Sequence, residues 1–256
     1  AFALVYPLVQ GRELGWPLWI FGLLALGLVG FGLFLAYERR RGEAPLIEPG
    51  LLRNGAYTSG MAVALAFFAA MIGMNLVFSL YCQYGLGFTP LHTGLTLAPL
   101  PLGIAFGAPV AFALIARLGR VVIQAGVVIN ALGMALLAAT VAHFGTGVTE
   151  WELAPGLLVA GVGMGFVLPP LFDVILAGVA DHEVGSASGV LNAVQQFAAA
   201  IGIAVFATVF FALRDHGDAA PAAMTGTVLL TIVPLIAALA LGFRLPEKPR
   251  LEPVVA

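Results

Sequence analysis

Long runs of apolar residues, almost free of charge, follow one another along most of this sequence. Seven of them come near the ~20 residues that cross a hydrocarbon core of ~30 Å. They occupy about residues 18–37, 57–81, 94–116, 121–142, 154–178, 188–212 and 223–243. Backbone groups in lipid find no water to bond, and the ten-residue alternation of barrel strands is absent. The pattern therefore predicts seven transmembrane helices and an all-α membrane protein.

The basic residues between these runs predict the orientation. If the run 18–37 crosses inward, one side of the membrane receives nine of the eleven Lys and Arg residues. The nine are Arg39, Arg40, Arg41, Arg53, Arg117, Arg120, Arg244, Lys248 and Arg250, whereas the other side receives Arg12 and Arg214. Cytoplasmic loops carry the excess of basic residues. The linker 38–56 and the tail 244–256 are therefore predicted to be cytoplasmic, and 143–153 external.

Composition supports a membrane protein and narrows its chemistry. Hydrophobic residues make up 61% of the 256 residues and charged residues only 9%, against roughly a quarter in soluble domains. The basic residues form no cluster that would bind nucleic acid. The one cysteine, Cys82, allows no internal disulfide, and no Cys and His spacing resembles a metal site. No nucleophile with a nearby base and no phosphate-binding loop is present, so we expect neither a cofactor nor an enzyme.

Polar residues inside the apolar runs fall on shared helix faces. Asn192, Gln195 and Gln196 stand at i, i+3 and i+4. One interpretation is hydrogen bonding between helices, which contributes only ~0.6 kcal/mol on average. Exposing three amides to lipid, however, would cost several kcal/mol for each. We therefore expect this face to line the bundle or a substrate cavity.

A second polar face lies in the run 57–81 and reaches its outer end. Asn75, Ser79 and Gln83 repeat there at i, i+4 and i+8. We expect them to line the same cavity, with Met71 and Met74 offering an adaptable apolar surface to lipophilic substrates.

Asp173 is the one acidic residue placed clearly within an apolar run, and it follows Pro169 and Pro170. A carboxylate at membrane depth is a candidate proton carrier. Because Asp173 lies within two turns of the cytoplasmic end, the alternative is that it reaches interfacial water. The sequence leaves both interpretations open.

Small residues recur at a spacing that permits close helix crossing. Gly103 with Gly107, and Gly161 with Gly165, form small-xxx-small pairs. They indicate either static packing or helices that rock during transport.

Several stretches resemble the fourteen-helix drug:proton antiporter branch of the major facilitator superfamily. They are YPLVQGRELGWPLW at 6–19, PLIEPGLLRN at 45–54, QYGLGFTPLHTGLTLAPLPLG at 83–103, GVGMGFVLPP at 161–170 and VGSASGVLNAVQQFAAAIGIAV at 184–205. The loop with Arg117, Gly119 and Arg120 resembles a basic loop of that superfamily, but Ala116 stands where an aspartate is common. This departure puts a gating role for the loop in doubt.

The resemblance implies a division of the chain into four parts. Residues 1–37 would hold the end of a truncated helix, an outer loop and one extra transmembrane helix, and 38–56 a cytoplasmic linker. Residues 57–243 would form the C-terminal six-helix half, followed by a cytoplasmic tail at 244–256. By the same resemblance the N-terminal half would be missing, and the apolar run 1–9, about half the length of a spanning helix, would be the end of the truncated helix.

The same resemblance implies a fragment of a proton-coupled exporter of drugs or small lipophilic molecules in a bacterial plasma membrane. Its partners would be the lipid bilayer, the substrate, protons and the missing N-terminal half. The alternatives are a specific metabolite or siderophore exporter of the same fold, and a half-size membrane protein with a structural role.

Overall fold

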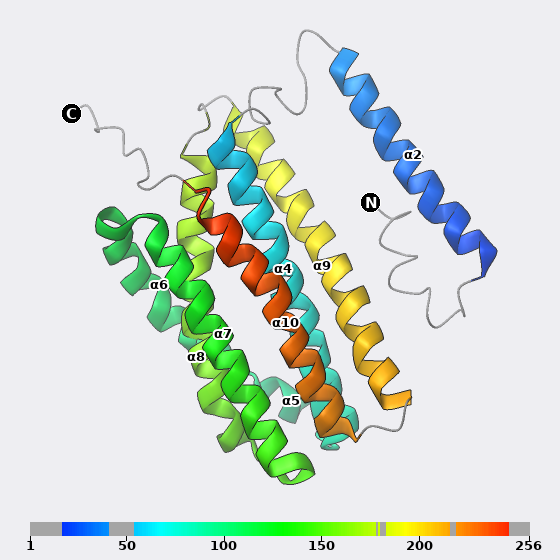
Figure 1. The fold of residues 1–256 in the computed structure, drawn as a ribbon, viewed down its shortest axis with the longest axis vertical. Helices are drawn as coiled ribbons and strands as arrows, with labels where there is room; N and C mark the ends of the chain where they lie inside the picture. The colour runs from blue at the N-terminus through cyan, green and yellow to red at the C-terminus, as the bar shows by residue number, and fades with distance from the viewer. Residues whose placement is uncertain (1–16, 41–53, 178, 180–182, 216–218, 246–256) are drawn as a thin grey trace.

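Helices account for nearly all of the chain that the structure describes. The computed structural model describes residues 17–40, 54–177, 179, 183–215 and 219–245. Its α-helices are α2 (Leu18–Arg40), α4 (Gly55–Leu80), α5 (Pro90–Thr96), α6 (Pro99–Leu118), α7 (Arg120–Phe144), α8 (Glu150–Leu176), α9 (Val184–Asp215) and α10 (Ala220–Gly242) (Figure 1). A π-helical turn, Tyr81–Gly85, extends α4, and a 3₁₀ turn, Gly145–Gly147, follows α7.

Six helical segments of the described chain are long and apolar enough to span a bilayer. They cover Gly55–Gly85, Pro90–Leu118, Arg120–Gly147, Glu150–Leu176, Val184–Arg214 and Ala220–Gly242. These correspond to six of the seven apolar runs. The remaining run forms α2, whose apolar stretch is Leu18–Gly27, so its crossing stays a prediction. The expectations for 1–16, 41–53 and 246–256 lie outside the described residues.

The ends of the helices differ from those of the apolar runs. The run 94–116 is interrupted, because α5 ends at Thr96 and α6 begins at Pro99. Proline lacks a backbone N–H and starts helices readily. Helix α8 begins at Glu150, four residues before the apolar run, where Thr149 and Glu152 form a capping box. Hydrophobicity marks the membrane-buried part of a helix, whereas capping residues mark its ends.

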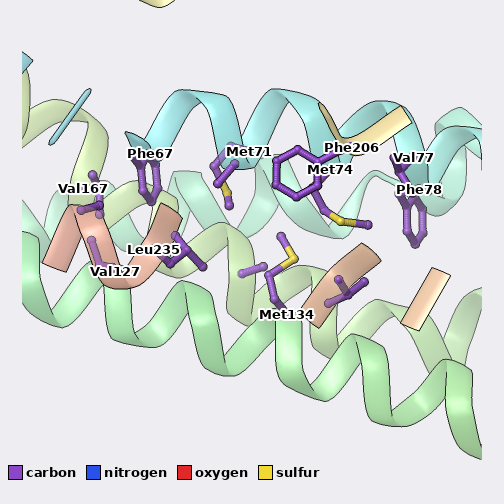
Figure 2. Close-up of a cluster of buried hydrophobic side chains, with 14 of the residues drawn as sticks. Phe67, Met71, Met74, Val77, Phe78, Val127, Met134, Val167, Phe206 and Leu235 are labelled. Atoms are coloured by element: carbon purple, nitrogen blue, oxygen red, sulfur yellow. The ribbon is translucent and has the colours of Figure 1, made fainter. Parts of the chain in front are cut away.

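Two groups of helices make up the six-helix body. Helix α8 packs between α6 and α7, whereas α4 packs against α9 and α10. Helix α10 also contacts α7, and α4 contacts α8, so the two groups share a core (Figure 1). Phe67 and Met74 of α4 are buried in that core with Val127 of α7 and Val167 of α8 (Figure 2).

Glycine sets the closest crossings. A Cβ added at Gly103 of α6 would overlap the carbonyl oxygen of Leu158 in α8, and one at Gly161 would overlap the carbonyl oxygen of Leu100. Gly107 and Gly165 lie against the opposing backbone in the same way. The predicted close contact at these small-xxx-small pairs is therefore confirmed. Sequence alone did not reveal that the two pairs face each other.

Helices α6 and α9 are the least covered of the spans. Only 17% of the most apolar stretch of Pro90–Leu118 and 28% of that of Val184–Arg214 is buried, against at least half in Gly55–Gly85, Arg120–Gly147 and Glu150–Leu176. The faces of α6 and α9 that do not pack on neighbouring helices are therefore open in this six-helix body.

Candidate substrate cavity

A mostly apolar, half-open cavity of about 230 Å³ lies among the helices of the six-helix body. Its walls come from α4, the α5–α6 junction, α7 and α8. The lining residues are Phe68, Met71, Ile72, Met74, Asn75, Phe78, Leu97, Leu100, Met134, Leu137, Leu157 and Met164. The cavity therefore has one amide and no charged side chain in its lining.

Four methionines bring flexible side chains to this cavity. Met71 and Met74 point from α4 toward Met134 on α7 (Figure 2), and Met164 of α8 joins the lining. Met74 is 2% exposed and Met134 is 4% exposed. Methionine is unbranched and polarisable, so it adapts to irregular apolar groups. The sequence predicted Met71 and Met74 as an apolar surface, but Met134 and Met164 were missed.

Asn75 is the polar member of the lining. It lies on the second-last turn of α4, its side chain is exposed, and its amide makes no hydrogen bond within the described part of the chain. Ser79 and Gln83 lie farther along the predicted polar face, where the Gln83 Nε2 donates to the Ser79 Oγ at 3.0 Å. These two side chains bond to each other, and neither is among the residues that line the cavity. The role of all three in transport stays a prediction.

The amides of α9 lie on a different surface. Asn192 and Gln196 are exposed and Gln195 is half-buried, and none of them lines the cavity. Gly185 and Gly189 on the same helix have open space where a Cβ would stand. The six-helix body therefore leaves this part of α9 uncovered, and its predicted contact with other helices or a substrate stays untested.

Asp173 is not among the residues that line the cavity. It lies in the last turns of α8, and its side chain is exposed. Its backbone carbonyl accepts the Ala177 N–H that closes the helix. This position favours the interfacial interpretation over a carrier buried at mid-membrane.

The loop between α6 and α7 connects those helices to the end of α10. Gly119 adopts φ 54°, a left-handed value suited to glycine, and lets α7 begin directly after α6. One Nη of Arg120 donates to the carbonyl oxygens of Phe243 and Leu245 at 3.0 and 3.1 Å. Arg117 is exposed. The loop therefore caps a neighbouring helix, and a gating role stays a prediction.

One contact between α5 and α8 involves His92. His92 lies in α5, stacks on Phe88 with ring centroids 4.0 Å apart, and places its Nε2 3.5 Å from the Glu150 carboxylate at the start of α8. Phe88 is four residues from His92, but Glu150 lies far along the chain, so only the packing of α5 on α8 brings His92 and Glu150 together.

Comparisons with known proteins agree with this architecture. Residues 3–203 match the family described as Major Facilitator Superfamily. The chain is 46% identical to the "Probable actinorhodin transporter" of Streptomyces coelicolor over 82% of this chain and 37% of that protein. It is 33% identical to the "Puromycin resistance protein pur8" of Streptomyces alboniger over 88% of this chain and 46% of that one.

A third relative is also named for drug resistance. The chain is 31% identical to the "Multidrug resistance protein Stp" of Mycobacterium tuberculosis, over 82% of this chain and 38% of that protein. The chain thus spans less than half the length of these curated relatives. The family match over most of the chain and the six apolar helices establish an integral membrane protein with a six-helix transporter architecture. This chain belongs to the Major Facilitator Superfamily.

Proposed function

We propose that this chain forms the C-terminal part of a proton-coupled exporter of drugs or small lipophilic molecules. The observation that carries the proposal is the apolar cavity with four methionines and a single amide, found in a chain whose relatives are named for transport or drug resistance. Pockets of this chemistry accept lipophilic molecules and orient them with few polar groups.

We further propose that export needs a second six-helix unit. Residues 57–243 would form one wall of a central cavity, with 1–37 contributing an extra helix and 38–56 the linker. Transporters of this kind alternate access by rocking one repeat against the other. The open faces of α6 and α9 support this proposal, because Asn192 and Gln196 on α9 would otherwise meet lipid at several kcal/mol each.

In the proposed orientation the ends of α6 and α10 face the cytoplasm. Arg117, Arg120 and Arg244 lie at those ends, whereas the 3₁₀ turn Gly145–Gly147 lies at the other end of α7. The excess of basic residues at the ends of α6 and α10 supports a cytoplasmic C-terminus. The proton carrier is then assigned to Asp173 or to the second unit, and the exposed position of Asp173 favours the second unit.

A second candidate is an exporter of one specific compound. The relative with 46% identity carries the name of a transporter for a single compound, actinorhodin, rather than for many drugs. The apolar lining of the cavity suits either candidate. Comparing efflux of several unrelated drugs separates them, because a broad exporter removes many and a specific one removes few.

The test compares two forms of the protein in a drug-sensitive bacterial strain. One is the 256-residue chain alone, and the other carries the preceding part of the Streptomyces coelicolor relative fused in front of it. We expect the fused form alone to expel ethidium and puromycin, and a protonophore to stop that efflux. No efflux by a correctly inserted fused form would contradict the proposal. Equal efflux by the chain alone would indicate a functional dimer of this unit.

A further inference from the structure

The walls of the cavity that the structure shows come from four helical segments of this six-helix unit. Met134 and Leu137 come from α7, which packs against α8 and α10, and they meet Met74 of α4 and Leu157 of α8 in the lining. A molecule in it would contact α4, α7 and α8 of this unit, and the open side of the cavity would lie beside Asn75.

The lining excludes a charged group. All of its residues are aliphatic, aromatic or methionine except Asn75. A buried ammonium or carboxylate without a partner loses its hydration at a cost of several kcal/mol or more. One neutral amide does not replace that hydration. The occupant of this space is therefore uncharged.

The volume limits how much of a ligand enters. Pockets for drug-sized molecules measure roughly 300–1,000 Å³. This cavity measures about 230 Å³, whereas an engineered apolar cavity of about 150 Å³ holds a benzene molecule. The space suits one ring or a fused pair of rings. The remainder of a larger substrate has to lie outside it.

The walls favour an aromatic occupant over an aliphatic one. Methionine sulfur makes favourable contacts with aromatic rings at ~5 Å, and four methionines surround the space. Phe68 is held at one side by stacking on Phe172, with ring centroids 6.1 Å apart and an interplanar angle of 16°. A flat ring would lie against a fixed aromatic wall and adjustable thioethers.

Asn75 stands where such a ring would meet the exterior. Its side chain is exposed although it belongs to the lining, and it makes no hydrogen bond within the described chain. An amide in this state can donate to or accept from a neutral polar group on a ligand. It is the only lining side chain able to do so with N or O atoms.

We propose that the cavity binds an aromatic ring system of an uncharged substrate and that Asn75 selects ligands with a hydroxyl or carbonyl next to that ring. This inference rests on the proposed function, of which it names the substrate class. Cationic drugs, if exported, would place their charge outside this cavity.

The methionines themselves provide a test. The chain has six, of which Met71, Met74, Met134 and Met164 line the cavity and Met61 and Met224 do not. With ¹³C-methyl methionine in the 256-residue chain in lipid nanodiscs, each methyl is followed by NMR and assigned by replacement with leucine. The probes are 1-naphthalenemethanol, 1-methylnaphthalene and 1-naphthylmethylammonium, which share one ring system and differ in polar group and charge.

We expect 1-naphthalenemethanol to shift the four cavity methyls saturably and to leave Met61 and Met224 unchanged. The ammonium probe should bind at least tenfold more weakly. Equal shifts of all six methyls, which indicate partition into lipid, would overturn the proposal. Binding of the ammonium probe as tight as that of the alcohol would do the same.

The role of Asn75 is tested by Asn75→Leu, with Thr208→Leu, at an exposed position of α9, as the control. Asn75→Leu should weaken binding of 1-naphthalenemethanol about fivefold, as expected for one net hydrogen bond, and change that of 1-methylnaphthalene less than twofold. Asn75→Gln should restore part of the difference. Equal weakening of both probes by Asn75→Leu would overturn the selective role.

These measurements are independent of export. Absence of saturable shifts in a fused form that expels drugs would defeat this inference and leave the proposed function intact. Saturable binding in a protein that expels nothing would leave this inference standing and defeat the proposed function.

Discussion

The Asn130 side chain of α7 donates a hydrogen bond of 2.9 Å to the carbonyl oxygen of Ala160 in α8. Asn130 is completely buried, and the bond lies at the closest approach of the two helices. Gly163 faces the Asn130 backbone there, and Gly133 faces that of Ala160. A polar bond and a steric fit therefore hold the same crossing.

We expect the steric fit to matter more than the bond. Asn130→Ala should lower the free energy of unfolding by about 0.5–1 kcal/mol, since hydrogen bonds between membrane helices are weak. Gly163→Val should lower it by about 2–3 kcal/mol, because even a Cβ there would overlap the Asn130 backbone nitrogen. Unfolding in detergent mixtures of increasing SDS content measures both. An equal or larger loss for Asn130→Ala would show that the bond dominates.

Unlike Gly163, Gly189 of α9 lies at a position that no other helix in the described part of this chain covers. Nothing lies within 4 Å of the place where its Cβ would stand, so Gly189→Leu should leave the unfolding of this chain within about 0.5 kcal/mol of the original. If a second unit packs on α9, the same change should lower drug efflux by the fused form at least fivefold, because small residues permit close helix contact. Unchanged efflux would place the second unit elsewhere.

Orientation can be measured with single cysteines in a Cys82→Ala background. Thr146 and Leu118 are exposed; Leu118 ends α6 just before α7 begins, and Thr146 lies in the turn that follows the other end of α7. We expect an impermeant maleimide added to intact cells to label Thr146→Cys, and Leu118→Cys to react only after the membrane is opened. The reverse pattern would overturn the orientation inferred from the basic residues.

Features that depend on neighbouring residues could be predicted from the sequence, whereas features formed by residues far apart in the chain could not. The spans and the tight pair Gly161 and Gly165 follow from local composition and spacing. The cavity does not, because Met74, Met134 and Met164 meet only through the packing of three helices. The pairing of His92 with Glu150 was missed for the same reason. Ser79 and Gln83 lie on one face, as their spacing indicated, and bond to each other, but they are not among the residues that line the cavity.

Arg120 should stabilise the end of α10. Its guanidinium donates to two carbonyl oxygens, those of Phe243 and Leu245, near the helix C-terminus, where positive charge is favourable. Because this end is partly exposed, Arg120→Gln should lower the free energy of unfolding by only about 1 kcal/mol. Arg117→Gln, at an exposed neighbour, serves as the control and should have little effect. The same SDS titration compares the two, and equal losses would argue against this contact.

Replacing Asp173 tests whether it is an interfacial carboxylate or a proton carrier. Its side chain is exposed in the last turns of α8, and it is not among the residues that line the cavity. We therefore expect Asp173→Asn in the fused form to keep at least half of the efflux driven by a proton gradient, measured in vesicles with an imposed pH difference. A carrier would behave differently, because an amide takes up no proton. Loss of gradient-driven efflux, with downhill substrate movement retained, would assign proton coupling to Asp173 and reverse this interpretation.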